Sequence, residues 1–229
     1  MYLETDNSIS NLPEQKIIKM IIQPDQITGF ILAGGNASRM RFVEKPLAKL
    51  GGKPLIQWVL SETFQHVSQI VINVNKNQSK YRKFGCTVIP DETHSHSGPL
   101  IGILSGLNFI AKDKSRKTPH YLLCIPGDVP FFPKQLISRL VSEMASDPCD
   151  VVLTKSNGQI QPLFSLWSVT AQKKIYDGVK RGLRGPLQVM SHLNNKVISI
   201  DSESQLEFLN INKESDLIFA KKLLAAFKT

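Results

Sequence analysis

The sequence FILAGGNASRMRFVEKPLAKLGGKPL, residues 30–55, joins a buried strand to a glycine turn and a run of cations. The strand is predicted over residues 27–33, which are mostly apolar, and it ends at Gly34 and Gly35. Because glycine has no Cβ, this turn lets backbone N–H groups approach an anion closely. Five basic residues follow it at short intervals: Arg39, Arg41, Lys45, Lys49 and Lys53. The stretch predicts either a phosphate site at the end of the strand or a tight turn followed by solvated charges.

Strands and helices alternate on the C-terminal side of this stretch. Apolar strands are predicted over residues 69–74, 86–90, 120–126 and 150–154, and the helices between them over 53–67, 98–113 and 133–146. Strands separated by single helices favour right-handed crossovers. We therefore predict an α/β, Rossmann-like three-layer sandwich with a mostly parallel sheet and helices on both faces. The remaining predicted elements are strands over 161–169, 196–201 and 207–212 and helices over 171–182, 185–193 and 213–228, with Asn212 as a helix N-cap.

Composition narrows the classes of ligand and compartment. The chain has 229 residues and a formal net charge of +9, which favours an anionic ligand, although a solvated basic surface explains the charge equally well. The three cysteines are scattered and form no C-x-x-C pair, so neither a disulfide framework nor a zinc site is expected. The N-terminus carries no signal or membrane segment, and we expect a cytoplasmic protein. Residues 1–26 are predicted to be a polar extension, and residues 27–229 one domain.

Two further loops are expected at the edge of the sheet where the glycine turn lies. Asp128 follows the strand 120–126, and a carboxylate beside a phosphate turn can hold Mg²⁺ together with phosphate oxygens and water. An aspartate in a Gly-Asp turn is the alternative reading. Asp91 follows the strand 86–90 and either binds ligand hydroxyls or caps its own turn. The sequence lacks both the P-loop and the G-x-G-x-x-G fingerprint, and it shows no interleaved aromatic and basic residues of the kind that bind RNA.

The motifs in this order resemble those of molybdenum cofactor guanylyltransferases, a branch of the nucleotidyltransferases built on a glycosyltransferase-A-like Rossmann variant. LAGGNASRM with Lys45 resembles the signature L-A-G-G-x-[SA]-x-R-M-G-x-x-D-K. The further matching stretches, in chain order, are GGKPLIQWV, VINVNKNQ, VIPDETHSHSGPLIGI, GDVPFF, QPLFSLW and FLNINKESDL. The resemblance covers roughly residues 27–220. It implies that a terminal phosphate of molybdopterin attacks the α-phosphorus of GTP and that pyrophosphate leaves.

The resemblance also implies roles for individual residues. The backbone of Leu32, Ala33, Gly34 and Gly35 matches the nucleotide cradle, and Asn73 and Asp91 match positions that contact the nucleoside. Lys45, Arg39 and Asp128 match the catalytic positions, with Asp128 as the Mg²⁺ ligand. Asn210 and Asn212 match the pterin side. Implied partners are GTP, molybdopterin or the molybdenum cofactor, and molybdoenzymes or their chaperones; nucleic acid and membrane are not expected.

The sequence departs from the signature at four positions, and other functions stay open. Arg41 and Phe42 replace small residues, Glu44 replaces the usual aspartate, and Ile101 stands where GPLAG has alanine. One alternative is a nucleotidyltransferase that uses CTP on molybdopterin or an NTP on a sugar phosphate. The other is a non-catalytic nucleotide- or pterin-binding protein.

Overall fold

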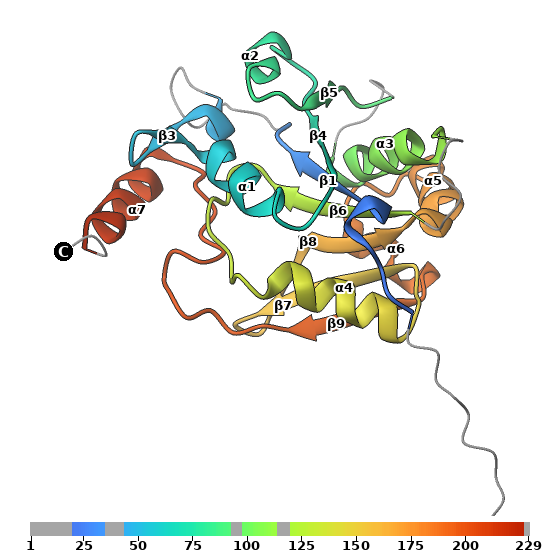
Figure 1. The fold of residues 1–229 in the computed structure, drawn as a ribbon. Coiled ribbons are helices and arrows are strands. Elements are labelled where there is room, and N and C mark those ends of the chain that lie inside the picture. The colour runs from blue at the N-terminus through green and yellow to red at the C-terminus, as the bar shows by residue number, and fades with distance from the viewer. Residues whose placement is uncertain (1–19, 35–43, 93–97, 114–119, 227–229) are drawn as a thin grey trace, which may run out of the picture.

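A computed structural model describes residues 20–34, 44–92, 98–113 and 120–226. These residues form an α/β fold built on a mixed sheet (Figure 1). The seven-stranded sheet has the order β5-β4-β1-β6-β8-β7-β9. Only β8 runs antiparallel to its neighbours, so the mostly parallel sheet is confirmed. The strands are β1 (Ile27–Leu32), β4 (Gln69–Asn73), β5 (Thr87–Ile89), β6 (Tyr121–Pro126), β7 (Val151–Ser156), β8 (Gln159–Ser168) and β9 (Asn195–Ser199).

The central strands are buried on both faces, which explains their nearly continuous apolar runs. Side chains alternate across the sheet, so that in β1 Ile27 and Ile31 pack into one core and Phe30 into the other. In β6, Leu123 packs with the first core and Leu122 with the second. The sheet therefore separates two hydrophobic layers, as a three-layer sandwich requires.

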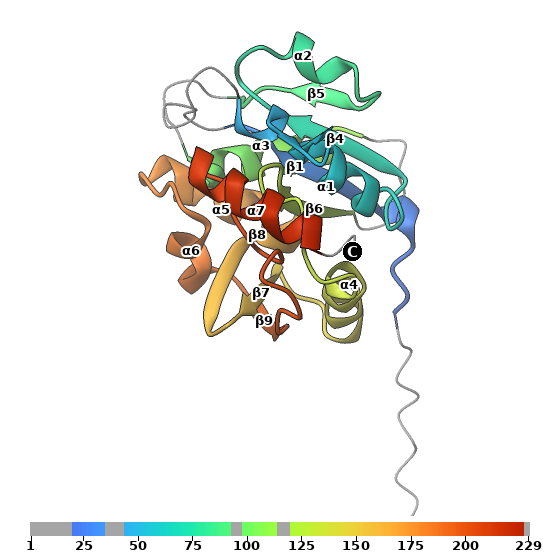
Figure 2. The ribbon, with the colours of Figure 1, turned by 90° about the vertical axis from the view of Figure 1, so that its left-hand side faces the viewer.

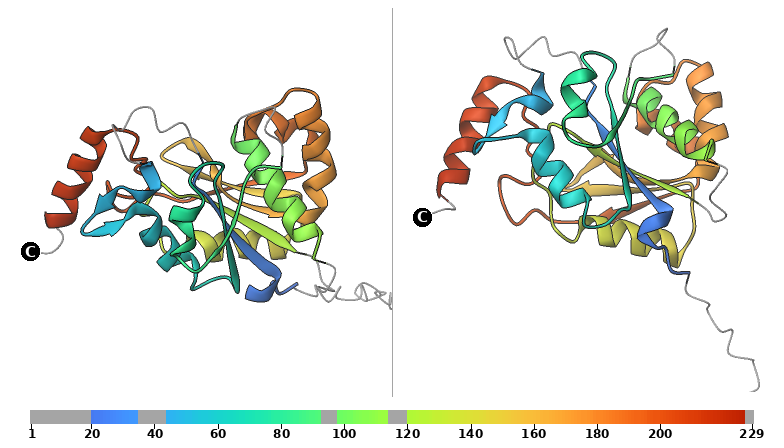
Figure 3. Two further views of the ribbon diagram at one scale, coloured as in Figure 1. Left: turned by 90° about the horizontal axis from the view of Figure 1, so that it is seen from above. Right: turned by 45° about the horizontal axis from the view of Figure 1, so that its top comes forward.

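Helices cover both faces of the sheet, as Figure 3 shows. The first core is closed by α1 (Leu55–Thr63) and α4 (Leu136–Ser146). The second is closed by α3 (Pro99–Ala111), α5 (Gln172–Lys180) and α6 (Pro186–Val189). The predicted three-layer arrangement is confirmed. The short helices are η1 (Pro24–Gln26), η2 (Lys45–Leu47), α2 (Ser79–Arg82), η3 (Val169–Ala171) and η4 (Met190–His192).

A small third core lies on the side of the molecule toward which β1 runs (Figures 1 and 2). The hairpin of β2 (Lys49–Leu50) and β3 (Lys53–Pro54) turns at Gly51 and Gly52, whose φ angles are 58° and 85°. The C-terminal helix α7 (Glu214–Ala226) packs on this hairpin through a cluster that includes Leu50, Ile211 and Ala220. This packing brings the residues just before α7 next to the segment that contains Lys45.

Two predicted elements need correction. The helix predicted over 53–67 is shorter, because residues 53–54 pair with residues 49–50 in the hairpin. The strand predicted over 207–212 is irregular: Phe208 has a φ of 58°, which no β-strand allows. Its N–H and that of Ile211 donate to the carbonyls of Phe131 and Asp128, in the loop after β6.

The described part of the N-terminal segment packs against the domain. Ile22 is buried in the first core, and the N–H of Ser68 donates to the carbonyl of Pro24 over 3.2 Å. Residues 1–19 lie outside the described residues, and the domain boundary at residue 27 stays a prediction. Among the described residues, no helix is long and apolar enough to cross a membrane.

Candidate nucleotide site

Three neighbouring parallel strands end together at one edge of the sheet. Leu32, at the end of β1, is in register with Asn73 of β4 and Pro126 of β6. Two bonds extend the ladder beyond the strands: Ala33 N–H to the carbonyl of Asn73 and Gly127 N–H to that of Leu32, both 2.9 Å long. In open α/β sheets, ligands bind outside such carboxyl ends.

Three side chains from distant parts of the chain meet at this edge. Lys45 is the first residue of η2, Asp128 lies two residues after β6, and Asn212 lies two residues before α7. Lys45 Nζ donates to Asn212 Oδ1 over 2.6 Å and lies 4.0 Å from Asp128 Oδ2. The side chains of Lys45 and Asp128 are 20% and 21% exposed, so both are sheltered and still reachable by a ligand.

Among the described residues, Lys45 and a backbone amide compensate the charge of Asp128 only in part. Burial raises the pKa of its carboxyl above the ordinary value, and Lys45 and the residue's own backbone amide only partly offset this effect. At 4.0 Å the lysine makes an ion pair with Asp128 but no hydrogen bond, and its short bond goes to Asn212. A sheltered carboxylate of this kind gains from a cation placed beside it.

The donor set suits a hard cation bound with phosphate. Among the described residues, no three His, Cys, Asp or Glu side chains gather into a group that could enclose a metal. Mg²⁺ does not need such an enclosure, because it binds through one or two carboxylates together with substrate phosphates and water. Asp128 fits this mode, with Lys45 as a further positive charge at the same place.

The predicted nucleoside contacts form a second cluster at the same edge. Asn73 Nδ2 donates to Asp91 Oδ1 over 3.0 Å, and Asn75 Nδ2 donates to Asp91 Oδ2 over 2.8 Å. The Asp91 N–H donates in turn to Asn75 Oδ1 over 2.7 Å. Asp91 is 7% exposed, and each carboxylate oxygen retains capacity for a further donor.

A glycine makes room for this cluster. A Cβ on Gly102, in the first turns of α3, would lie 2.8 Å from Asn73 Oδ1 and 2.8 Å from Leu32 Cδ2. The Asn73 amide is not a freely moving side-chain end, because Asn73 is buried and bonded to Asp91. The second glycine of the GPLIG motif is therefore required for the fit of α3 against β1 and β4.

The structure thus brings Leu32, Ala33, Gly34, Asn73, Asp91, Lys45, Asp128 and Asn212 to one edge of the sheet. Asn210 is exposed in the same segment as Asn212. Gly35, Arg39, Arg41 and Phe42 lie outside the described residues. Ile101 is fully buried in the second core, where its larger side chain packs among apolar neighbours.

The expected N-cap role of Asn212 is wrong. Its side chain binds Lys45, whereas Asp216 Oδ2 accepts from the N–H groups of Asn212 and Lys213 over 2.9 and 3.0 Å. Sequence reasoning also missed Asn75 and the contacts of Glu44. The available signal was the alternation of Asn73, Asn75 and Asn77 in INVNKN.

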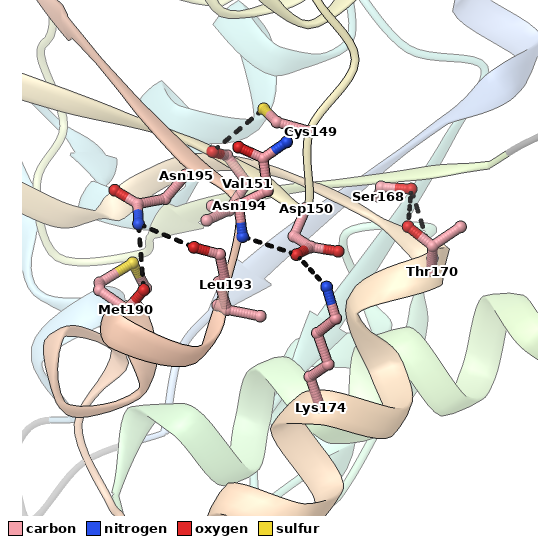
Figure 4. A network of polar contacts seen from close by, with 10 residues as sticks. All are labelled: Cys149, Asp150, Val151, Ser168, Thr170, Lys174, Met190, Leu193, Asn194 and Asn195. Atoms are coloured by element: carbon pink, nitrogen blue, oxygen red, sulfur yellow. Dashed lines mark hydrogen bonds and ion pairs between the residues drawn. The ribbon is translucent and has the colours of Figure 1, made fainter.

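The opposite edge of the sheet carries a carboxylate of a different kind (Figure 4). Asp150, just before β7, accepts from Lys174 Nζ over 2.6 Å and from the N–H of Asn194 over 2.8 Å. Its side chain is 8% exposed. The bonds join α5 and the start of β9 to β7, which is a structural function.

Comparison with known proteins places this chain in a family and agrees with its fold. Residues 29–196 match the family described as the MobA-like NTP transferase domain. A molybdenum cofactor guanylyltransferase of Polynucleobacter asymbioticus is 35% identical over 201 residues, which cover 86% of this chain and 96% of that protein. One of Haemophilus influenzae (strain 86-028NP) is 35% identical over 192 residues, covering 83% and 95%.

A solved structure agrees at the level of the fold. Molybdopterin-guanine dinucleotide biosynthesis protein A from Archaeoglobus fulgidus superimposes with a TM-score of 0.69 at 22% identity, covering 87% of this chain and 99% of that one. The family match spans the sheet from β1 to the start of β9 and includes Lys45, Asp91 and Asp128. The chain belongs to the MobA-like NTP transferase family.

Proposed function

We propose that this protein transfers GMP from GTP to the terminal phosphate of molybdopterin, with release of pyrophosphate and with Mg²⁺ bound at Asp128. The names of the relatives support the substrates. The observation that carries the proposal is the meeting of Lys45, Asp128 and Asn212 at the carboxyl ends of β1 and β6. A sheltered but reachable cation and an undercompensated carboxylate at one place match a metal-bound polyphosphate.

In this proposal the protein acts by position and charge. Lys45 neutralises phosphate oxygens of GTP, and Asp128 holds the metal. Bound Mg²⁺ would stabilise charge on the α-phosphate and on the departing pyrophosphate. The acceptor phosphate is already anionic, so the reaction needs no strong general base. Arg39 remains a predicted contact to the outer phosphates.

The two ends of the substrate pair are assigned to different segments. The backbone of Leu32–Gly35 cradles the nucleotide, and the Asn73–Asp91 pair takes the nucleoside side. Asn210 and Asn212 take the pterin side. Because Asn212 also accepts from Lys45, the pterin end and the phosphate end of the site share a hydrogen bond. Substituting Asn212 would therefore disturb both, and Asn210 is the cleaner probe of pterin binding.

Pyrophosphate release tests the activity. The purified protein is incubated with Mg²⁺, molybdopterin and each of the four NTPs in turn, and thermal stabilisation by each NTP is measured in parallel. We expect release with GTP and a larger stabilisation by GTP than by ATP, CTP or UTP. A clear preference for CTP would indicate cytidylyl transfer. Release only when a sugar phosphate replaces molybdopterin would indicate a different acceptor, and stabilisation without release would indicate a binding protein.

A further inference from the structure

Three alternating asparagines, Asn73 at the end of β4 and Asn75 and Asn77 after it, link two parts of the site. Asn73 and Asn75 donate to the two carboxylate oxygens of Asp91. Asn77, two residues further on, donates from Nδ2 to Glu44 Oε1 over 2.8 Å. One short segment, residues 73–77, is therefore bonded to the nucleoside-side carboxylate and to the residue that precedes Lys45.

Glu44 is held by two donors at once. Besides Asn77, Lys80 Nζ donates to Glu44 Oε1 over 2.9 Å. The Glu44 side chain is 18% exposed, whereas that of Lys80 is 56% exposed. Lys80 lies in α2 and Asn77 two residues before it, and α2 is anchored by Tyr81, which is fully buried in the first core. The contact therefore joins the Lys45 segment to a fixed part of the domain.

The negative charge of Glu44 is paired with Lys80 in this contact. Burial alone raises the pKa of a carboxyl group, but the polar contacts of Lys80, Tyr81 and Asn77 and the charge of Lys80 leave the pKa of Glu44 below its ordinary value. Glu44 is thus ionised at neutral pH and already neutralised by Lys80. It suits a structural anion better than a ligand of phosphate.

The backbone conformation at position 77 favours asparagine or glycine. Its φ is 53°, in the left-handed region that asparagine tolerates better than most residues. This conformation begins the turn into α2, in which Lys80 N–H donates to the Asn77 carbonyl over 2.9 Å. Glycine would keep the backbone and lose only the amide side chain.

We propose that Glu44 is a positioning residue for Lys45: its bonds to Asn77 and Lys80 tie η2 to the same asparagine segment that orients Asp91. Lys45 is then fixed from two directions, by Asn212 at its ammonium group and by Glu44 at its backbone. The link sets the distance between the phosphate side and the nucleoside side of one nucleotide. This inference rests on the proposed function for its catalytic consequence.

A matched pair of substitutions isolates the side chain of Asn77. Asn77→Gly removes the donor to Glu44 and keeps the positive φ. Asn157→Gly makes the same change in the β7–β8 turn, where Asn157 is exposed and has a φ of 48°. We expect Asn77→Gly to lower kcat about three- to tenfold, since a hydrogen bond to a charged group is lost. Asn157→Gly should leave kcat unchanged.

A double-mutant cycle tests whether Glu44 acts through Lys45. Glu44→Ala alone should lower kcat about ten- to hundredfold, because a misplaced catalytic group costs that much. In a Lys45→Ala background the same substitution should change kcat less than about twofold. A factor that is equal in both backgrounds would mean that Glu44 acts independently of Lys45, and it would overturn the proposal.

Hydrogen exchange tests the link without any activity. The N–H groups of Leu47 and Ala48 donate to the carbonyls of Glu44 and Lys45 over 2.9 and 3.0 Å. Their exchange should accelerate in Glu44→Ala and Asn77→Gly but not in Asn157→Gly; unchanged rates in all three would show that Glu44 does not hold η2. If the wild type transferred nothing from any NTP, the proposed function would fail, and this exchange would still decide the link.

Discussion

Asp128 and Asp150 stand at opposite edges of one sheet, each facing a lysine, yet they are bonded in different ways. Asp150 accepts a 2.6 Å bond from Lys174 and a 2.8 Å bond from the N–H of Asn194. Asp128 has its lysine 4.0 Å away, and that lysine bonds to Asn212 instead. The comparison shows that Asp150, whose carboxylate is closely hydrogen-bonded, stabilises the fold. Asp128, whose lysine lies 4.0 Å away, is available to a ligand.

The ionised carboxylate of Asp128 lowers the stability of the folded protein. Because the fold raises the pKa of Asp128, the folded state binds this proton more tightly than the unfolded state does. The ionised carboxylate therefore lowers the free energy of unfolding once the pH exceeds its raised pKa. As the pH falls through that value toward the ordinary 3.8, this cost disappears. A bound cation would remove it at neutral pH.

The largest expected effect comes from Asp128→Asn, which keeps the size of the side chain and removes its charge. We expect transfer at ordinary Mg²⁺ to fall about 10³-fold, because charge stabilisation at the reacting phosphates is lost. The melting temperature at neutral pH should stay the same or rise, since the cost of the buried charge is gone. Wild-type pyrophosphate release from the folded variant would make Asp128 a turn residue only.

Lys45→Ala should have the next largest effect. We expect kcat to fall about 10²-fold, since a cation near the developing charge is removed. Lys49→Ala is the matched control, because Lys49 is exposed in the neighbouring strand β2. Steady-state kinetics and a circular dichroism melt of both variants check this prediction. Equal, small losses in the two would mean that Lys45 is an ordinary surface charge.

Asp150→Asn should lower stability and leave transfer almost unchanged, which is the opposite of the result expected for Asp128→Asn. We expect the free energy of unfolding to fall by about 1–2 kcal/mol, because bonds to a charged acceptor are weakened and Lys174 is partly screened by solvent. Transfer by the folded protein should stay within about twofold of the wild type, since its lysine and carboxylate belong to another edge. Urea unfolding measures the first quantity. A large loss of transfer with unchanged stability would contradict the assignment of a structural function to Asp150.

Gly102→Ala should have the smallest effect, and this effect should appear mainly in the binding of GTP. The new Cβ would press on Asn73 and Leu32, so we expect the Kd for GTP to rise about three- to tenfold with some loss of stability. Gly106→Ala, on the same helix, would press on Leu122 and Phe30 in the core. It should lower stability without changing the Kd. Calorimetric titration with GTP that finds the same Kd change in both variants would contradict this account.

Most of the fold could be predicted from the sequence because its strong signals are local. The apolar runs of β1 and β6 and the single helices between the strands are enough to imply a parallel sheet. The β2–β3 hairpin was missed although its Gly51–Gly52 turn is a local signal. The irregular course of residues 207–212 was missed because tertiary contacts decide it. Phe208 and Ile211 bond to loop carbonyls some 80 residues away in the chain, which no local pattern reports.

The candidate site was predictable only to the level of which residues share an edge. The positions of Asp128 and Asp91 after strands placed them at the carboxyl ends. That Asn212 reaches Lys45, 167 residues away, depends on how α7 packs against the hairpin. The bond from Asn77 to Glu44 likewise spans 33 residues between two loops. Such pairs follow from packing, and a single sequence carries no direct sign of them.

The Mg²⁺ dependence of GTP binding tests most directly that Asp128 is a carboxylate kept open for a cation. GTP affinity is measured by calorimetry across a Mg²⁺ titration for the wild type, Asp128→Asn and Asp150→Asn. We predict that Asp150→Asn follows the wild type and that Asp128→Asn needs at least about tenfold more Mg²⁺ for half of its effect. Superimposable Mg²⁺ curves for the wild type and Asp128→Asn would contradict the claim and place any metal site elsewhere.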